Sequence, residues 1–375
     1  MKKRIAINTR LLLKDKLEGI GVFGHEVLSR MTQAHPEVDF HFLFDRPFDP
    51  MFIYGKNVTG HVLFPQARHP ILYYLWSEWV VKRKLDELQP NLFLSIDGLR
   101  SLRSDVKQLA VMHDINFEHH PEYLPWLTGR YYRHYFPRFA KKATRLATVS
   151  EYSKKDICQS YGIHKDKVDV VFNGASDSFR PLTEPQRKVT RIELTQGAPY
   201  LIYVGALQPR KNIGRMMKAF DAYKIANGTE LKLLITGEKK WWSSEQEKIF
   251  EGLTHKDDIR FTGRLSQQNL VKALGASEGL LYVSTFEGFG IPILEAMHVD
   301  VPVLTSKVSA MPEVGGDAVV YCDPFSVESI RDGILEIMND KRRGELIEKS
   351  RIQRTLFSWD KSADLLWQSI EQAWG

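Results

Sequence analysis

Short apolar segments alternate with helix-like stretches along almost the whole chain, and this alternation restricts the possible folds more than any other feature. A first series of apolar segments lies at residues 4–8, 40–44, 92–95, 108–112, 145–149 and 168–172, and a second at 200–204, 231–236, 259–262, 280–283, 301–305 and 318–321. Parallel strands that are covered by helices on both faces have this apolar composition. The sequence therefore predicts an α/β protein with two parallel sheets.

The region between the two series is polar and rich in proline. Residues 181–198 contain Pro181 and Pro185 and lack apolar periodicity. We expect a linker there, between an N-terminal domain of residues 1–180 and a C-terminal domain of residues 199–357. A capped amphipathic helix is predicted at about 358–375. The 375 residues suffice for two domains that each bury a core.

Composition and charge narrow the class of protein. With 43% apolar and 26% charged residues and no apolar run near the roughly 20 residues of a membrane span, the chain reads as a soluble globular protein. Its basic start lacks the apolar stretch of a signal peptide, so we expect a cytoplasmic protein. Cys158 and Cys322 indicate neither a disulfide framework nor a metal site. Residues 1–180 contain 27 Lys and Arg against 20 Asp and Glu, which suits an anionic partner such as a nucleic acid, a membrane surface or a lipid phosphate.

Two glutamates flank a glycine-rich turn after the predicted strand 280–283. Glu287 precedes and Glu295 follows the sequence Gly-Phe-Gly-Ile-Pro, in which Pro292 is predicted to begin a helix. The start of a helix binds phosphate through free N–H groups, and glycines let the backbone approach it. Each carboxylate can accept two hydrogen bonds from a vicinal diol of a hexose or a ribose. An isolated glutamate pair is more often solvated, but the embedded turn favours a nucleotide-sugar site.

Two adjacent cations, Arg210 and Lys211, follow the predicted strand 200–204. They lie at the sheet edge where α/β proteins bind ligands, and a solvated turn is the alternative. Arginine can hold phosphate oxygens in a fork while lysine supplies a point charge, and both would oppose the negative charge of a departing nucleotide. No Asp-x-Asp pair occurs in the chain, so we expect these cations to act without a metal or another cofactor.

Two features of the first half also fall near expected strand ends. His113 follows the strand 108–112, although a histidine there more often caps local structure than catalyses. Gly19, Gly21 and Gly24 match a dinucleotide-binding fingerprint, but that fingerprint needs its first glycine directly after the strand. A flexible phosphate- or sugar-facing loop before the first helix therefore fits better than nicotinamide binding.

Basic and aromatic residues interleave at residues 129–145 and again at 73–84, where Trp76 and Trp79 precede Lys82. Either stretch could lie on an anionic membrane or receive a lipid-linked phosphate. An amphipathic helix packed on the sheet explains each stretch equally well. Nucleic-acid binding is disfavoured, because no recognised module accompanies the charge.

Taken together, these motifs resemble the family 4 glycosyltransferases of the GT-B fold. The resemblance is strongest between Tyr200 and Pro324, where Gly-Ala-Leu-Gln-Pro-Arg-Lys-Asn, Phe-Thr-Gly, Phe-Glu-Gly-Phe-Gly-Ile-Pro and Met-Pro-Glu-Val follow one another. It implies two Rossmann-like domains whose parallel sheets face a central cleft. The C-terminal domain would bind a nucleotide sugar, the N-terminal domain would bind the acceptor, and the last helix would cross back to the first domain.

The resemblance also implies roles for individual residues. Glu287 would contact the donor hexose and Glu295 the ribose, and His113 would lie near the reacting carbon. The catalytic residues would be His113, Arg210, Lys211 and Glu287, and the donor-binding residues Gly19, Gly21, Gly205, Gly263, Arg264, Leu265, Gly288, Phe289, Gly290, Ile291 and Glu295. Two positions depart from the family pattern: Ala206 stands where many members have arginine, and Asp300 replaces a common glycine.

The family retains the anomeric configuration, so the resemblance implies a retaining, metal-independent transferase. A likeness to mannosyltransferases of surface-polysaccharide and lipopolysaccharide assembly makes GDP-mannose the first expected donor and UDP-hexoses the second. The acceptor would be a glycan or a lipid-diphosphate-linked glycan, with peripheral association of the basic N-terminal domain with the inner membrane surface. A nucleotide-sugar 2-epimerase of the same fold and a non-catalytic sugar-binding subunit remain as alternatives.

Overall fold

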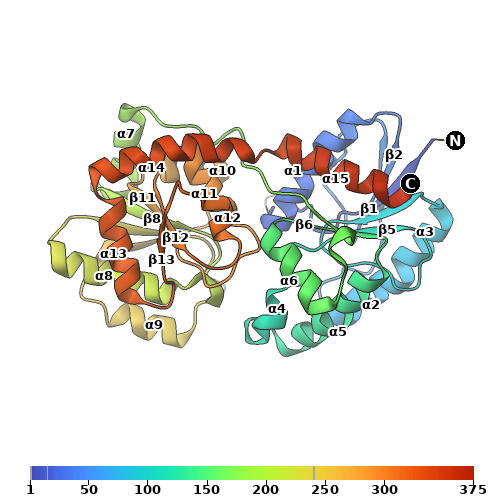
Figure 1. Ribbon diagram of the computed structural model, residues 1–375, viewed down its shortest axis with the longest axis horizontal. Coiled ribbons are helices and arrows are strands. Elements are labelled where there is room, and N and C mark those ends of the chain that lie inside the picture. The colour runs from blue at the N-terminus through green and yellow to red at the C-terminus, as the bar shows by residue number, and fades with distance from the viewer. Residues whose placement is uncertain (1, 15, 240) are drawn as a thin grey trace. The chain divides into compact units, whose positions relative to one another are not determined.

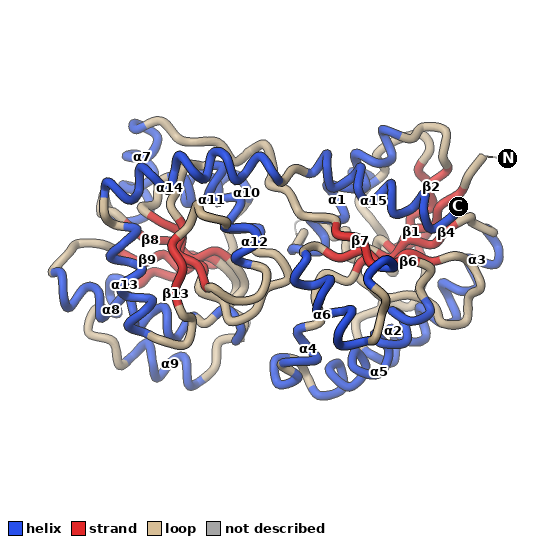
Figure 2. Tube along the Cα trace, viewed as in Figure 1, coloured by secondary structure: helices blue, strands red, loops and turns tan. Residues whose placement is uncertain are grey.

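The computed structural model describes residues 2–14, 16–239 and 241–375, and it divides into two compact units (Figure 1). The first unit comprises residues 1–173 and 358–375, and the second comprises residues 174–357. Each unit contains one parallel sheet with helices on both faces (Figure 2). The predicted α/β class with two parallel sheets is confirmed.

The seven strands of the first unit run in the order β3-β2-β1-β4-β5-β6-β7. Their bounds are β1 Arg4–Asn8, β2 Asp39–Phe44, β3 Val58–Val62, β4 Leu92–Ser95, β5 Gln108–Val111, β6 Arg145–Thr148 and β7 Val168–Val170. Strand β3 was not predicted, because Thr59 and His61 interrupt its apolar pattern. The order changes direction between β1 and β4, which makes their carboxyl ends the switch point where open α/β sheets bind ligands.

The six strands of the second unit run in the order β10-β9-β8-β11-β12-β13. Their bounds are β8 Tyr200–Val204, β9 Lys232–Thr236, β10 Ile259–Gly263, β11 Gly279–Tyr282, β12 Val303–Ser306 and β13 Val320–Cys322. Here the switch point lies between β8 and β11. The segments after these two strands carry the predicted cation pair and the first predicted glutamate.

The helices cover the sheets in the usual alternation with strands. Their bounds are α1 Gly19–Ala34, α2 Pro70–Leu75, α3 Lys82–Leu88, α4 Asn116–His119, α5 Trp126–Lys142, α6 Glu151–Tyr161, α7 Glu184–Thr195, α8 Ile213–Asn227, α9 Ser244–Glu251, α10 Gln267–Gly275, α11 Ile291–His298, α12 Met311–Gly315, α13 Val327–Ile337, α14 Asp340–Gln353 and α15 Trp359–Trp374. No helix in the described part of the chain is long and apolar enough to cross a membrane.

The last helix, α15, belongs to the first unit. Ser358 caps its start by accepting a hydrogen bond from the Lys361 N–H. Its buried side includes Trp359, Ala363, Leu366 and Ile370, which recur at helical spacing. This apolar stripe packs on α1 and on the central strands of the first sheet.

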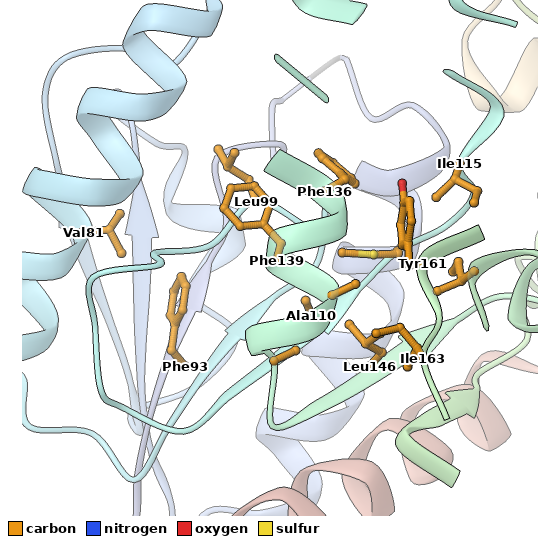
Figure 3. Close-up of a cluster of buried hydrophobic side chains, with 14 of the residues drawn as sticks. Val81, Phe93, Leu99, Ala110, Ile115, Phe136, Phe139, Leu146, Tyr161 and Ile163 are labelled. Atoms are coloured by element: carbon orange, nitrogen blue, oxygen red, sulfur yellow. The ribbon is translucent and has the colours of Figure 1, made fainter. Parts of the chain in front are cut away.

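The core of the first unit joins its sheet to α5 and α6. Figure 3 shows Phe93, Ala110 and Leu146 from neighbouring strands beneath Phe136 and Phe139 of α5. Burying rings of this size contributes about 1.5–3 kcal/mol each. The aromatic residues of the stretch 129–145 thus serve largely in packing.

The expected linker over 181–198 is wrong for most of its length, because α7 occupies residues 184–195. Thr183 and Gln186 form a capping box at its start, and Pro185 lies in the first turn, where proline is tolerated. Helix α7 packs on α10, and Arg191 forms a 2.5 Å ion pair with Glu278. Pro185 thus lies within the start of a helix, and residues 184–195 are part of the second unit.

Candidate active site

The switch point of the second sheet brings together three charged residues that are distant in sequence. Strand β8 ends at Val204 and is followed by a short 3-10 helix, Pro209–Lys211, which carries Arg210 and Lys211. The neighbouring strand β11 ends at Tyr282, and the segment after it carries Glu287. Two hydrogen bonds tie these segments together. The Thr285 N–H donates to the Arg210 carbonyl at 2.8 Å, and the side-chain Nδ2 of Asn212 donates to the Val283 carbonyl at 3.1 Å.

Both oxygens of the Glu287 carboxylate are bound by cations. Arg210 Nη1 lies 2.5 Å from Glu287 Oε2, and Lys211 Nζ lies 2.5 Å from Oε1. Lys211 also donates to the Tyr282 hydroxyl at 2.8 Å. Glu287 is 5% exposed and Lys211 is 7% exposed, so this ion-pair group is largely removed from water.

The ion-pair group of Arg210, Lys211 and Glu287 has a net positive charge. Burial by itself would raise the pKa of Glu287, but the adjacent guanidinium and ammonium groups lower it to about 2. Glu287 is therefore ionised at neutral pH, and two cations share one carboxylate. The sequence placed all three residues at one sheet edge and did not predict that they touch.

The glycine-rich turn leads from this group into α11. Gly288, Phe289 and Gly290 are buried. Gly290 is the N-cap of α11 and has a φ of +109°, which a residue with a Cβ adopts only under strain. No side chain caps this helix start, and Ile291 precedes Pro292 as the first helical residue. The expected strand-turn-helix is thus present, with the helix starting one residue earlier than predicted.

Glu295 lies on α11, where its side chain is half-buried. Within the described part of the chain its carboxylate has no hydrogen-bond or ion-pair partner. Burial raises the pKa of Glu295 from 4.5 to about 7. Glu295 thus combines a carboxylate without a partner and a place on a helix whose start has no side-chain cap. A ligand hydroxyl would satisfy such a carboxylate.

Three adjacent strands of the second unit end in glycines with positive φ, namely Gly205 after β8, Gly237 after β9 and Gly263 in β10. A Cβ on Gly237 would lie 1.9 Å from the Gly205 carbonyl oxygen, so these two turns pack backbone against backbone. Gly237 was not predicted as a site residue, although Thr236-Gly237 repeats the pattern of a strand followed by a glycine. Arg264 is exposed and Leu265 half-buried directly after β10.

In the first unit, His113 follows β5 and is half-buried. Its Nε2 lies 2.9 Å from the Ile96 carbonyl oxygen, so this nitrogen carries a proton and donates it. The Phe23 ring packs edge-on against the imidazole, with 4.9 Å between the ring centres. Burial lowers the pKa of His113. A neutral ring that donates through Nε2 has Nδ1 as its hydrogen-bond acceptor.

The predicted flexible loop at the first glycines is wrong, because α1 already begins at Gly19. Gly21 lies in the first turn, where a Cβ would come within 2.8 Å of the Leu11 carbonyl oxygen. A Cβ on Gly24 would lie 2.4 Å from the Ile96 side chain. Because Gly21 and Gly24 have no side chain, the segment before α1 and the segment after β4 pack closely on the helix.

A polar cluster that the sequence did not predict lies at the switch point of the first sheet. Asp97 follows β4 and accepts hydrogen bonds from Asn8, Ser95 and the Leu99 N–H at 2.8–3.0 Å. Its second oxygen lies 2.6 Å from Arg10 Nε.

The Arg10 guanidinium lies over the Tyr73 ring at 5.2 Å, and the Tyr73 and Tyr132 rings stack at 6.3 Å. Arg10 and Asp97 each lie two residues after a strand of the switch point. This placement is the sequence signal from which the cluster could have been predicted.

Both units match models of protein families. Residues 17–179 match the model described as Glycosyltransferase Family 4, and residues 186–353 match the model described as Glycosyl transferases group 1. These two matches, together with the two parallel α/β sheets, identify a glycosyltransferase of the GT-B fold. The chain belongs to family 4 of these enzymes, as the two models together show.

Individual relatives point the same way. The chain is 26% identical to O-antigen chain mannosyltransferase B of Escherichia coli, over 93% of this chain and 94% of the relative. It is 25% identical to O-antigen chain mannosyltransferase RfbU of Salmonella typhimurium, over 75% and 74% of the two chains.

Among solved structures, the fold is similar to that of WaaG, a glycosyltransferase involved in lipopolysaccharide biosynthesis, with a TM-score of 0.75, 17% identity and coverage of 96% and 97%. It is also similar to HepE of Anabaena in complex with UDP and glucose, with a TM-score of 0.75, 14% identity and coverage of 99% and 100%.

Proposed function

We propose that this enzyme transfers mannose from GDP-mannose to a glycan acceptor, without a metal ion and with retention of the anomeric configuration. The observation that carries the proposal is the buried group of Arg210, Lys211 and Glu287, whose net charge is positive. Positive charge that is fixed in a site of low polarity stabilises a departing nucleoside diphosphate. Mannose is supported by the mannosyltransferases among the relatives.

The donor would lie along the carboxyl edge of the second sheet. Its diphosphate would face Arg210, Lys211 and the uncapped start of α11, because helix starts favour anions. Glu295 would accept hydrogen bonds from the ribose hydroxyls, which would satisfy its unpartnered carboxylate. The backbone of residues 263–265 would line the base, and the backbone of residues 288–291 would contact the hexose and diphosphate.

The chemical step would be a substitution on one face of the sugar. The acceptor hydroxyl oxygen forms a bond to the anomeric carbon while the bond from that carbon to the phosphate oxygen breaks, and the hydroxyl proton passes to the departing phosphate. Glu287 is poorly suited to act as a nucleophile, because both of its oxygens are held by cations and its pKa is near 2. Its role would be to position the two cations and to contact the hexose.

On the first unit, the acceptor would bind at the switch-point cluster and His113. Asp97 neutralises Arg10, so the remaining guanidinium donors suit sugar hydroxyls better than a phosphate. The stacked rings of Tyr73 and Tyr132 offer an apolar surface for a pyranose face. His113 would accept a hydrogen bond through Nδ1 from a hydroxyl near the reacting carbon.

Replacing Lys211 tests the proposed function. The Lys211→Ala variant should lower kcat about 100- to 1000-fold, the usual cost of one group that stabilises developing charge, with a much smaller change in the dissociation constant for GDP-mannose. Transfer from radiolabelled GDP-mannose and calorimetric binding measure the two quantities. Lys218→Ala, an exposed lysine on the neighbouring helix α8, is the matched control.

Three outcomes would contradict the proposal. Unchanged turnover in Lys211→Ala would show that the cation pair does not act in the chemical step. If a chelator abolished wild-type activity and a divalent ion restored it, the reaction would depend on a metal ion. Conversion of the donor to its 2-epimer without an acceptor would point to an isomerase.

A further inference from the structure

A buried tyrosine, Tyr282, lies beside the ammonium group of Lys211. It is the last residue of β11 and is 2% exposed. Lys211 Nζ donates a hydrogen bond of 2.8 Å to the Tyr282 hydroxyl and lies 4.8 Å from the centre of the ring. The same nitrogen lies 2.5 Å from Glu287 Oε1. A strand residue and a residue of the following loop therefore hold one ammonium group from two directions.

The side chain of Tyr282 is fixed by its surroundings. Strand β11 lies between β8 and β12 in the second sheet, and the Thr305 hydroxyl donates to the Tyr282 backbone carbonyl at 2.8 Å. The glycine-rich turn packs on the ring, since a Cβ on Gly290 would lie 3.6 Å from Tyr282 Cε1. Tyrosine is a rigid side chain, whereas the carbon stem of lysine is flexible. Tyr282 is thus able to fix the position of a more mobile group.

The Tyr282 hydroxyl binds the ammonium as a neutral group. Burial and then the negative charge of Glu287 raise the pKa of Tyr282 well above its usual value. The phenol therefore keeps its proton and accepts the hydrogen bond from Lys211 without a charge of its own. A carboxylate in this place would cancel the net positive charge that remains when Arg210 and Lys211 share Glu287. A tyrosine orients the ammonium and leaves that charge intact.

We propose that Tyr282 is a positioning residue that orients the Lys211 ammonium toward the departing diphosphate. The inference rests on the proposed function, in which Lys211 stabilises the charge that develops as the nucleotide leaves. Such stabilisation depends on cations that are already in place before the charge develops. Glu287 attracts the ammonium from one side, and the Tyr282 hydroxyl fixes its direction from another.

A second buried tyrosine of the same sheet provides a matched control. Tyr200, the first residue of β8, is fully buried, and its hydroxyl donates to the Ala273 carbonyl at 2.6 Å. Removing the hydroxyl of Tyr200 or of Tyr282 takes one buried hydrogen bond from the second unit. Only the hydroxyl of Tyr282 is bonded to Lys211, so only its loss should change the chemical step.

The Tyr282→Phe variant keeps the ring and removes the hydroxyl alone. It should lower kcat for transfer from GDP-mannose about 10- to 100-fold, the usual effect of losing a hydrogen bond to a charged group. The loss should be smaller than in Lys211→Ala, because Lys211 keeps its ion pair with Glu287. The dissociation constant for GDP-mannose, measured by calorimetry, should change less than about threefold. Tyr200→Phe should leave both quantities unchanged.

A double variant separates positioning from a general structural role. In Tyr282→Phe/Lys211→Ala, turnover should equal that of Lys211→Ala within about threefold, because the hydroxyl acts only through the ammonium. If Tyr282 only supported the fold, its substitution would lower turnover by the same factor whether Lys211 is present or not.

Urea unfolding tests the contact without any substrate. Tyr282→Phe should raise the equilibrium constant for unfolding about 10- to 100-fold in the wild-type background and much less in the Lys211→Ala background. Tyr200→Phe should have the same effect in both backgrounds, because its hydroxyl has no contact with Lys211.

Unchanged kcat in Tyr282→Phe would overturn the proposal, and so would equal losses of turnover, or equal changes in unfolding, with and without Lys211. If Lys211→Ala lowers turnover and Tyr282→Phe does not, the proposed function stands and this inference fails. Wild type that transfers no mannose from GDP-mannose would contradict the proposed function. The unfolding measurements would then still decide whether Tyr282 holds Lys211, so the two failures are distinguishable.

Discussion

Glu295 allows a prediction in which stability and ligand binding change in opposite directions. Its pKa is raised to about 7 in the folded protein by burial without a partner, against an ordinary value of 4.5. Below pH 4.5 the carboxyl is protonated in both the folded and unfolded states and has no effect. As the pH rises through 7, ionisation costs the folded state more than the unfolded state, and stability is lost.

The magnitude follows from the two pKa values. A tenfold change in proton affinity is worth about 1.4 kcal/mol, so the difference between 7 and 4.5 costs the folded state about 3 kcal/mol at pH 8. Solvent at this half-buried group makes that figure an upper bound. The Glu295→Gln variant keeps the shape and cannot ionise. It should therefore match the wild type near pH 4.5 and be up to about 3 kcal/mol more stable at pH 8.

Urea unfolding of both proteins at pH 5 and pH 8 measures this effect, with Glu193→Gln on α7 as an exposed control. In the same variant, binding of GDP-mannose at pH 8 should weaken about 10- to 100-fold, because a hydrogen bond to a charged group contributes about 1.5–3 kcal/mol. A stability difference that is the same at both pH values would refute the reasoning about burial. Unchanged donor affinity would refute the ribose assignment.

Two further substitutions test the clusters at the switch points. Glu287→Gln leaves buried Lys211 and half-buried Arg210 without their carboxylate and should lower the free energy of unfolding by about 3–5 kcal/mol in urea at pH 7. In the wild type this stabilisation should be lost only as the pH falls from 4.5 through about 2. A neutral effect would show that the ion pairs contribute little. Arg10→Ala should raise the KM for a glycan acceptor at least about tenfold and leave the dissociation constant for GDP-mannose unchanged. The rest of the cluster should stay in place, because Asp97 keeps its hydrogen bonds to Asn8, Ser95 and Leu99. A parallel loss of donor affinity would contradict an acceptor role.

The sequence predicted the structure correctly where one short segment contains all the residues that determine its conformation. The turn between β11 and α11 is an example, because the strand, the glycines and Pro292 are adjacent and each has a strong backbone preference. The same holds for α15, whose cap and apolar spacing are read directly from the chain. Prediction from the local sequence was wrong where one residue type occurs in two kinds of structure. Pro185 suggests a linker but lies in the first turn of α7, and Gly21 suggests a flexible loop but permits a close contact with Leu11.

The sequence by itself determined that the chain forms two parallel α/β sheets and that its charged residues follow the strands, since hydrophobic periodicity and turn chemistry are local properties. Only the tertiary structure decided which of those residues touch. Arg210 and Lys211 meet Glu287, more than 70 residues later, because β8 and β11 are neighbours in the sheet order. It also decided that Trp76 is buried while Trp79 is exposed, since burial depends on what packs against each face of a helix.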